Sequence, residues 1–292
     1  MERALLIYNP FSGDRGVVNR LDLIIRRLQE KNIFIVPYRL NFRDSFLLVQ
    51  LLQQEKFDFI IISGGDGTLN SVVNILLSNN IHLPIGLIPA GTCNDFARCL
   101  GLPTDLNLCL ELILAGRTMA VDVGLINEKQ YFLSSCAGGN FADVSFNTQN
   151  ELKKHLGPFA YYLKALSEVT SIKSFNIKLE TEQKTWEEEV LLFLVLNGKH
   201  AAGFSNLIDC ADFTDGIMDI VLVKNCNHLE MASLFFKVLS SDALNDKDVT
   251  IIRTSICNIY ADSSIATSID GEKGSDLPFN IRFLSKRLEI LI

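Results

Sequence analysis

Short apolar runs alternate with stretches of helical periodicity from Ala4 to about Asp122. The runs are rich in β-branched residues and predict strands, and the periodic stretches between them predict helices. The predicted strands cover residues 4–8, 34–36, 57–63 and 85–88, and the predicted helices cover 21–29, 44–53, 69–77, 94–100 and 106–115. This alternation predicts an α/β domain with a doubly wound, mostly parallel sheet and helices on both faces.

After Val121 the pattern changes to a series of strand-like pieces. They cover residues 131–133, 176–180, 190–196, 218–223, 250–254 and 257–260, with helices expected only over 150–169 and 228–239. Such a pattern predicts a C-terminal domain that is an antiparallel β-sandwich-like structure. We expect a nucleotide-binding domain at 1–124 and a β-rich domain at 125–277, with a tail of about 278–292 that returns to the first domain. No long Pro-rich or Gly/Ser-rich linker separates the halves, so the junction near residue 124 should be tight.

Composition narrows the functional classes. The net charge of −7 and the pI near 5.2 argue against a nucleic-acid partner, whose binding surface would normally be basic. The longest apolar runs, 57–62 and 190–196, are far shorter than the roughly 18 residues of a membrane span. The first residues also lack a signal-peptide core, so we expect a cytoplasmic protein. Seven cysteines without a C-x-x-C pair predict reduced thiols rather than disulfides or a zinc site.

The segment from Ser63 to Asn70, SGGDGTLN, lies between a predicted buried strand and a predicted helix. Glycines at this place let backbone N–H groups approach phosphate oxygens, and the start of a helix adds partial positive charge. An aspartate that faces phosphate needs a cation between them, so we interpret Asp66 as a Mg²⁺-linked group. The alternative is a strand–helix turn in which the glycines serve geometry alone.

This segment resembles the G-G-D-G-T-x-N nucleotide loop shared by diacylglycerol kinases, sphingosine and ceramide kinases, and NAD kinases. Residues 9–13, NPFSG, look like the N-P-x-S-G element of the lipid kinases, and residues 89–98, PAGTCNDFAR, are similar to their P-x-G-T-x-N-D-F-A-R stretch. Taken singly, the first is more often an ordinary turn, and Asn94 or Asp95 could cap a helix. Together, at three successive strand ends, they resemble the soluble bacterial diacylglycerol kinase family.

The resemblance implies an ATP site and a Mg²⁺-linked group of carboxylates. The residues implied in nucleotide binding are Asn9, Pro10, Phe11, Ser12, Gly13, Gly64, Gly65, Asp66, Gly67, Thr68, Leu69, Asn70, Gly91, Thr92 and Asn94. Asp122 matches a further acidic position of the family, and with Asp66 and Asp95 it completes the implied metal cluster. Three carboxylates in one cleft repel each other unless cations or water networks occupy the space between them, so they predict a metal-dependent site.

Two later motifs carry further implied roles. Residues 268–272, SIDGE, resemble the family's D-G-E element, in which Glu272 matches the proton acceptor and would act with Asp66 in catalysis. Without the family this is only a turn between strands. Residues 212–217, DFTDGI, look like the D-x-x-D-G segment that holds a structural Mg²⁺ through Asp212, Asp215 and the carbonyl of Ile217. Asp219 could also serve if the turn were shifted by a few residues.

The resemblance implies an ATP-dependent lipid kinase that phosphorylates the hydroxyl of diacylglycerol to give phosphatidate. It also implies a possible homodimer that meets its lipid at the bilayer surface, peripheral to the inner face of the membrane. Sphingosine, ceramide or a glycolipid as acceptor, an NAD kinase, and a nucleotide-binding regulator without activity stay open as alternatives. The sequence identifies neither the lipid-binding residues nor the cation that neutralises the phosphates, for which Arg15, Arg20 and Arg98 are candidates. The amphipathic, basic stretch 152–164 is either a solvated helix face or a contact with anionic lipid.

Overall fold

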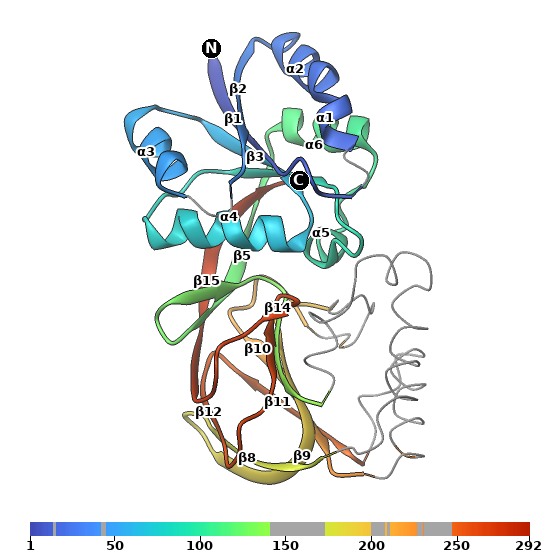
Figure 1. Cartoon of the computed structure of the whole chain (residues 1–292), viewed down its shortest axis with the longest axis vertical. Coiled ribbons are helices and arrows are strands. Elements are labelled where there is room, and N and C mark those ends of the chain that lie inside the picture. Colours follow the sequence, from blue (N-terminus) through green and yellow to red (C-terminus); the bar gives the residue numbers. More distant parts are fainter. Residues whose placement is uncertain are drawn as a thin grey trace. The chain divides into compact units, whose positions relative to one another are not determined.

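The computed structural model describes residues 1–13, 16–41, 45–140, 173–199, 208, 211–226, 230 and 247–292 (Figure 1). Apart from residue 230, the helices predicted over 150–169 and 228–239 lie outside the described residues, as do the stretch 152–164 and Arg15. The chain divides into two compact units. The first consists of Met1–Val121 together with Lys286–Ile292, and the second of Asp122–Ser285.

The first unit is built on a parallel sheet with the strand order β4-β3-β1-β2. Its strands are β1 (Glu2–Tyr8), β2 (Ile33–Arg39), β3 (Phe59–Gly64) and β4 (Ile85–Pro89). Its helices are α1 (Gly16–Asn19), α2 (Leu21–Gln29), α3 (Phe46–Gln54), α4 (Asp66–Ser78), α5 (Asp95–Cys99) and α6 (Leu106–Ala115). The last part of β15 (Phe279–Leu291) adds a parallel partner to β4, with Ile290 opposite Ile85.

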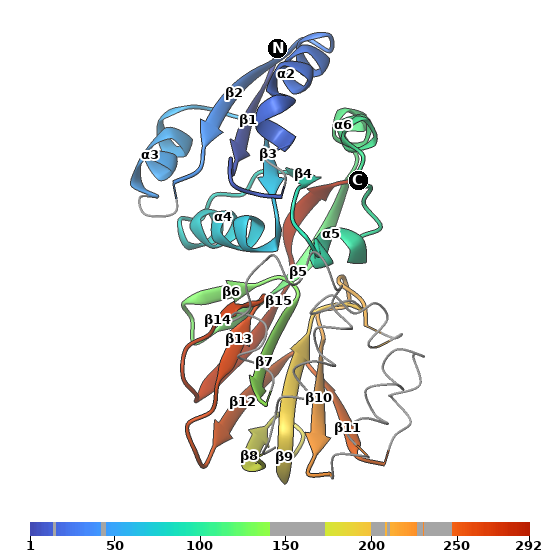
Figure 2. The same ribbon diagram turned by 45° about the vertical axis from the view of Figure 1, so that its right-hand side comes forward.

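Helices cover both faces of this sheet (Figure 2). On one face, Ala4 and Leu6 of β1 share a buried core with Ile24 of α2 and Leu110 of α6. Helices α3 and α4 lie on the opposite face. The central strand β3 is buried along nearly its whole length, because it has strands on both sides and helices on both faces. Its carboxyl end, where the next loop begins, is therefore held rigidly.

The second unit is an antiparallel structure. Its strands are β5 (Thr118–Ile126), β6 (Gln130–Phe132), β7 (Ser135–Gly139), β8 (Phe175–Glu180), β9 (Thr185–Leu196), β10 (Met218–Lys224), β11 (Val249–Thr254), β12 (Ile256–Ala261), β13 (Thr267–Ile269), β14 (Glu272–Lys273) and β15. The order β14-β13-β7-β9-β8-β12-β15 forms the main ladder, and β10 joins β9 to β11. β5 and β15 each begin in one unit and end in the other.

The predicted fold class is confirmed: a mostly parallel N-terminal sheet is followed by an antiparallel, β-sandwich-like domain. The predicted helices over 21–29 and 106–115 match α2 and α6 residue for residue. The pattern did not reveal β7, β13 and β14, which are two to five residues long, nor the longer β5 and β15, which have nine and thirteen residues. None of the described helices has the length and apolar character needed to cross a bilayer.

Candidate active site

Three loops follow the carboxyl ends of β1, β3 and β4, and two of them touch through glycines. A Cβ atom added to Gly65 would lie 2.9 Å from the Cα of Gly91, and one added to Gly91 would lie 2.6 Å from the Cα of Gly65. Contacts this short leave no room for a side chain at either position. Gly13 of the first loop is equally close to the third, since a Cβ there would lie 2.4 Å from the carbonyl oxygen of Ala90. The three sequence motifs are thus packed against one another.

Polar side chains tie the first loop to helix α4. The Asn9 amide donates a hydrogen bond of 3.0 Å to the Thr68 hydroxyl, and Ser12 Oγ lies 3.5 Å from the same oxygen. The carbonyl oxygen of the Asn9 side chain accepts a 3.0 Å bond from the backbone N–H of Phe11. Asn9 and Thr68 therefore brace the loops, a role that the sequence did not indicate. Their contact with a nucleotide stays a prediction.

Asp66 begins α4 and faces the start of α5. Its Oδ1 atom accepts a hydrogen bond of 3.3 Å from the backbone N–H of Phe96. Burial raises the pKa of Asp66, while hydrogen bonds from the backbone N–H groups of Asp95, Phe96 and Asn94 act in the opposite direction. The carboxylate thus supplies a cap for N–H groups at the start of α5, which have no acceptor within the helix.

Asn94 closes its own loop instead of capping α5. Its Oδ1 atom accepts a 2.8 Å bond from the backbone N–H of Gly91, and its Nδ2 atom donates a 3.0 Å bond to the carbonyl oxygen of Gly91. Asn94 is the residue before α5, but its side chain makes no capping bond there. The reading of Asn94 as a simple side-chain cap is therefore wrong. Asp95 lies in the first turn of α5 and is 8% exposed.

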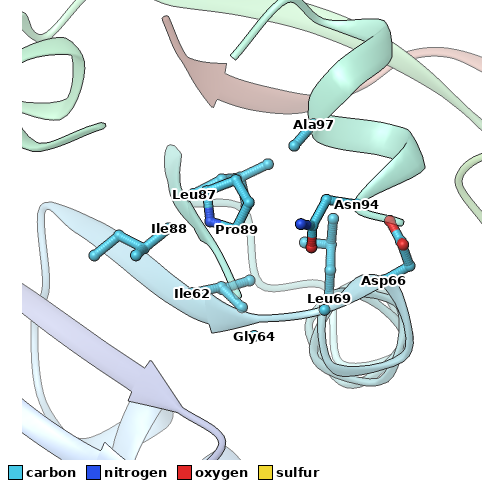
Figure 3. A pocket seen from close by; sticks show the side chains of 10 residues that line it. Ile62, Gly64, Asp66, Leu69, Leu87, Ile88, Pro89, Asn94 and Ala97 are labelled. Carbon is cyan, nitrogen blue, oxygen red and sulfur yellow. The ribbon is translucent and has the colours of Figure 1, made fainter. Parts of the chain in front are cut away.

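A small hollow lies beside these loops (Figure 3). Its volume is about 20 Å³, which has room for about one water molecule. Its lining is formed by Ile62, Gly64, Gly65, Asp66, Leu69, Leu87, Ile88, Pro89, Asn94 and Ala97. It is too small for a nucleotide.

Of the candidate phosphate-neutralising cations, Arg20 and Arg98 are both exposed.

In the second unit, the segment 212–219 folds into a tight acidic turn. Asp212 Oδ1 accepts hydrogen bonds from the backbone N–H and the hydroxyl of Thr214, at 2.9 Å and 2.8 Å. Asp215 Oδ1 accepts a 2.9 Å bond from the backbone N–H of Ile217. The N–H of Gly216 donates to Oδ2 of Asp122, which is fully buried, over 2.5 Å. The turn is therefore built around the buried carboxylate of Asp122.

An arginine that the sequence did not single out forms ion pairs with two carboxylates of this turn. Arg253 donates a 2.6 Å hydrogen bond to Asp215 Oδ2, and its Nε atom lies 3.1 Å from Asp219 Oδ1. Asp219 is 1% exposed, and burial raises its pKa while Arg253 acts to lower it. Asp219 is thus engaged in an ion pair. No sequence signal connects Arg253 with the turn, because the contact depends on the pairing of β10 with β11, which sets Asp219 opposite Arg253.

Glu272 is exposed and begins β14, where it pairs with Ile269 of β13. Asp270 and Gly271 form the two-residue turn between these strands.

Within the described ranges, no three side chains of the His, Cys, Asp and Glu types are grouped so that they could hold a metal ion. The roles of Asp66, Asp95 and Asp122, and of Asp212, Asp215 and Ile217, as Mg²⁺ ligands stay predictions.

Two family models match the chain. Residues 3–126 match the diacylglycerol kinase catalytic domain, and residues 136–292 match the YegS C-terminal NAD kinase beta sandwich-like domain. A diacylglycerol kinase of Staphylococcus carnosus is 31% identical over 290 residues, which cover 99% of this chain and 94% of the relative. A diacylglycerol kinase of Staphylococcus aureus is also 31% identical over 290 residues, covering 99% and 92%.

Solved structures give the same result. The crystal structure of a diacylglycerol kinase from Bacillus anthracis superimposes with a TM-score of 0.81 and 27% identity, and the match covers 99% of this chain and 96% of the other. Another crystal structure from the same organism has a TM-score of 0.84 at 27% identity, covering 99% and 95%. Together the matches support a lipid kinase that phosphorylates an alcohol group and uses ATP. The chain belongs to the diacylglycerol kinase family.

Proposed function

We propose that the chain transfers the γ-phosphate of ATP to the hydroxyl group of diacylglycerol and releases phosphatidate. The full-length relatives named diacylglycerol kinase support this choice of lipid. The single observation that carries the chemistry is the contact of Gly65 with Gly91, which brings the loops after β3 and β4 together. Backbone N–H groups at a helix start beside such loops are suited to phosphate oxygens.

The loops after β1, β3 and β4 would bind the phosphates of ATP along their outer side, since the hollow beside them has room for about one water molecule. In this proposal Asn9, Ser12 and Thr68 keep the loops in register. Phosphoryl transfer requires mainly charge neutralisation and in-line positioning of the attacking oxygen. The protein therefore contributes chiefly a rigid arrangement of N–H donors.

Mg²⁺ fits the chemistry of the acidic residues, which offer the hard oxygen ligands that it prefers. Asp66 and Asp95, with Asp122, would hold the catalytic ion, which neutralises phosphate charge when bound. Burial of Asp66 agrees with this role, because a cation would offset the cost of its buried charge. In the turn 212–219, Asp212, Asp215 and the carbonyl of Ile217 would hold a structural ion, with Asp215 shared between that ion and Arg253.

Glu272 would accept the proton of the lipid hydroxyl as it attacks the γ-phosphate. Its carboxylate is exposed, so it is accessible to a substrate. A general base of this kind typically contributes a factor of about 10² to 10⁴ to the rate. We therefore expect Glu272→Gln to lose most of the activity while it keeps the affinity for ATP.

The test is phosphorylation of lipids by radiolabelled ATP and Mg²⁺, followed by thin-layer chromatography. Diacylglycerol, sphingosine, ceramide, a glycolipid and NAD are compared at equal concentration. Labelled phosphatidate as the main product supports the proposal. Preferential labelling of another lipid or of NAD would replace diacylglycerol as the substrate. No labelled product with any acceptor, together with ATP binding, would favour a nucleotide-binding regulator.

The substrate is a membrane lipid, so the protein would work at the bilayer surface, at the cytoplasmic face of the membrane. Flotation with vesicles that contain diacylglycerol tests this association. Light scattering of the purified protein tests whether it is a homodimer. Loss of vesicle binding would contradict the surface proposal without affecting the kinase assignment.

A further inference from the structure

The hairpin that carries Glu272 is very short. β13 has three residues and β14 has two, and β14 pairs only with β13 among the described strands. Asp270 and Gly271, the two turn residues, have φ angles of +48° and +84°. Positive φ at both positions is the pattern of a type I′ turn. A hairpin this small is marginally stable by itself, so something else must hold its tip.

The carboxylate of Asp270 provides that anchor. Its Oδ2 atom accepts a hydrogen bond of 2.7 Å from the backbone N–H of Leu133, and its Oδ1 atom accepts bonds of 2.8 Å and 2.9 Å from Ser134 and Ser135. The backbone N–H of Asp270 donates in return to the carbonyl oxygen of Ser135 over 2.8 Å. Hydrogen bonds to a charged acceptor are about twice as strong as neutral ones. Four bonds therefore fix one turn residue to the segment 133–135.

The segment 133–135 is itself held from its other side by Asn197. The backbone N–H of Asn197 donates to the carbonyl oxygen of Ser134, and its side-chain amide donates to the carbonyl oxygens of Leu133 and Asp122, each over 2.9 Å. Asn197 is fully buried, and Leu133 and Ser134 are nearly so. The N–H groups of this segment thus bind Asp270, while the carbonyl groups of Leu133 and Ser134 bind Asn197. The segment is a rigid base for the hairpin.

We infer that Asp270 is a positioning residue for Glu272, and that its bonds to the segment 133–135 set the place of the Glu272 backbone two residues later. The inference rests on the proposed role of Glu272 as proton acceptor. A displacement of about 1 Å in a catalytic group can cost about 10²-fold in rate. Because β14 pairs only with β13 among the described strands, we expect release of Asp270 to let Glu272 shift on this scale.

Asp270→Asn is the main test. The amide keeps one acceptor oxygen and places an NH₂ group against at least one of the three N–H donors. We expect kcat to fall by about 10- to 100-fold, with the KM for ATP unchanged. The matched control is Asp262→Asn. Asp262 also accepts a backbone N–H bond, of 3.1 Å from Asn176, but it directly follows β12 and bonds to β8, so the kcat of Asp262→Asn should stay at the wild-type value.

A double variant separates positioning from general damage. If Asp270 acts through Glu272, adding Asp270→Asn to Glu272→Gln should cause no further loss of kcat. A further loss of the size seen for Asp270→Asn alone would overturn the inference. A normal kcat for Asp270→Asn beside an inactive Glu272→Gln would also overturn it, while leaving the proposed function intact. An active Glu272→Gln would remove the proposed role of Glu272 and the inference with it.

Gly271→Ala keeps the test decisive if Asp270→Asn does not fold. A Cβ at Gly271 would meet nothing within 4 Å, so this change only strains the turn at its φ of +84°. We expect a smaller fall in kcat, by several-fold, because relief of the strain in the turn would shift the backbone of Glu272. Gly116→Ala is the matched control, since Gly116 also has a positive φ and open space around it. Unchanged kcat in Gly271→Ala, with normal folding, would overturn the inference.

Discussion

The side-chain amide of Asn9 donates a hydrogen bond to the hydroxyl of Thr68 over 3.0 Å and across 59 positions of the chain. This bond joins the loop after β1 to the helix that follows β3. Thr68 is 4% exposed, so its hydroxyl is removed from water. The arrangement of the loop after β1 is therefore supported by a hydrogen bond between a half-buried side chain, Asn9, and a buried one, Thr68.

Thr68→Val should break this brace, because it replaces the hydroxyl by a methyl group of similar size and leaves the Asn9 amide without its acceptor. We expect the free energy of unfolding to fall by about 1–3 kcal/mol. The KM for ATP should rise in parallel. Thr68→Ser keeps the hydroxyl and is the control. Equal urea denaturation curves for the two variants would contradict the brace.

Gly65→Ala should separate the loops after β3 and β4, because its Cβ would lie 2.9 Å from the Cα of Gly91. We expect ATP affinity, measured by calorimetry, to fall at least about tenfold, which corresponds to about 1.4 kcal/mol. Gly116→Ala again serves as control, because it loses stability without altering the loops. An ATP affinity of Gly65→Ala equal to that of the control would show that the contact is not needed.

Arg253→Gln should leave the buried carboxylate of Asp219 without its cation. The cost of breaking a buried pair is about 3–5 kcal/mol, and we expect about 2 kcal/mol here because the Arg253 side chain is 42% exposed. Thermal unfolding measures the loss. Adding Asp219→Asn removes the unpaired charge and should recover part of it. If the double variant were as unstable as the sum of both single changes, the pair would not account for the effect.

The turn 212–219 also allows a test of the proposed structural metal ion. If Asp212, Asp215 and Ile217 hold Mg²⁺, the ion should raise the midpoint of thermal unfolding, by mass action on the folded state. The rise should be larger in Arg253→Gln, because Asp215 then has no competing cation. A midpoint that is the same in Mg²⁺ and in EDTA for both proteins would argue against this ion.

Burial raises the pKa of the Cys257 thiol to about 12, from an ordinary value of 9.0. The unfolded chain therefore releases this proton at a lower pH than the folded protein does. Stability should fall as pH rises from about 9 towards 12, by at most about 1.4 kcal/mol per pH unit for this group. Cys257→Val should flatten that part of the curve of unfolding free energy against pH. An unchanged slope would contradict the raised pKa.

The sequence predicted those parts of the fold that local patterns encode. α6 shows why, since Asp105 accepts bonds from the N–H groups of Asn107 and Leu108 at its start and Gly116 ends it. β9 was predicted only over its apolar half, because residues 185–189 carry mostly polar side chains that alternate in exposure. The signal of β13 and β14 was too short, as two or three residues cannot show a period.

The site was predictable where motifs sit at strand ends, since carboxyl ends of parallel strands meet at one edge of a sheet. That reasoning located the loops containing Gly65 and Gly91, which the structure brings into contact. It missed Arg253, and it assigned no role to Asn197 and no separate role to Asp270. Each of these acts through contacts with residues far away in the chain, which depend on strand pairing rather than on neighbouring sequence.

Leu291 is buried in the same core as Ala4 and Leu6, and Ile290 pairs with Ile85. During translation, these last strand residues leave the ribosome only after the whole second unit has been made. The edge of the first unit's sheet at β4 therefore lacks its partner β15 while the intervening 164 residues, Asp122–Ser285, are synthesised. During this period the exposed apolar edge of the first unit is prone to aggregation, and binding by a chaperone would protect it.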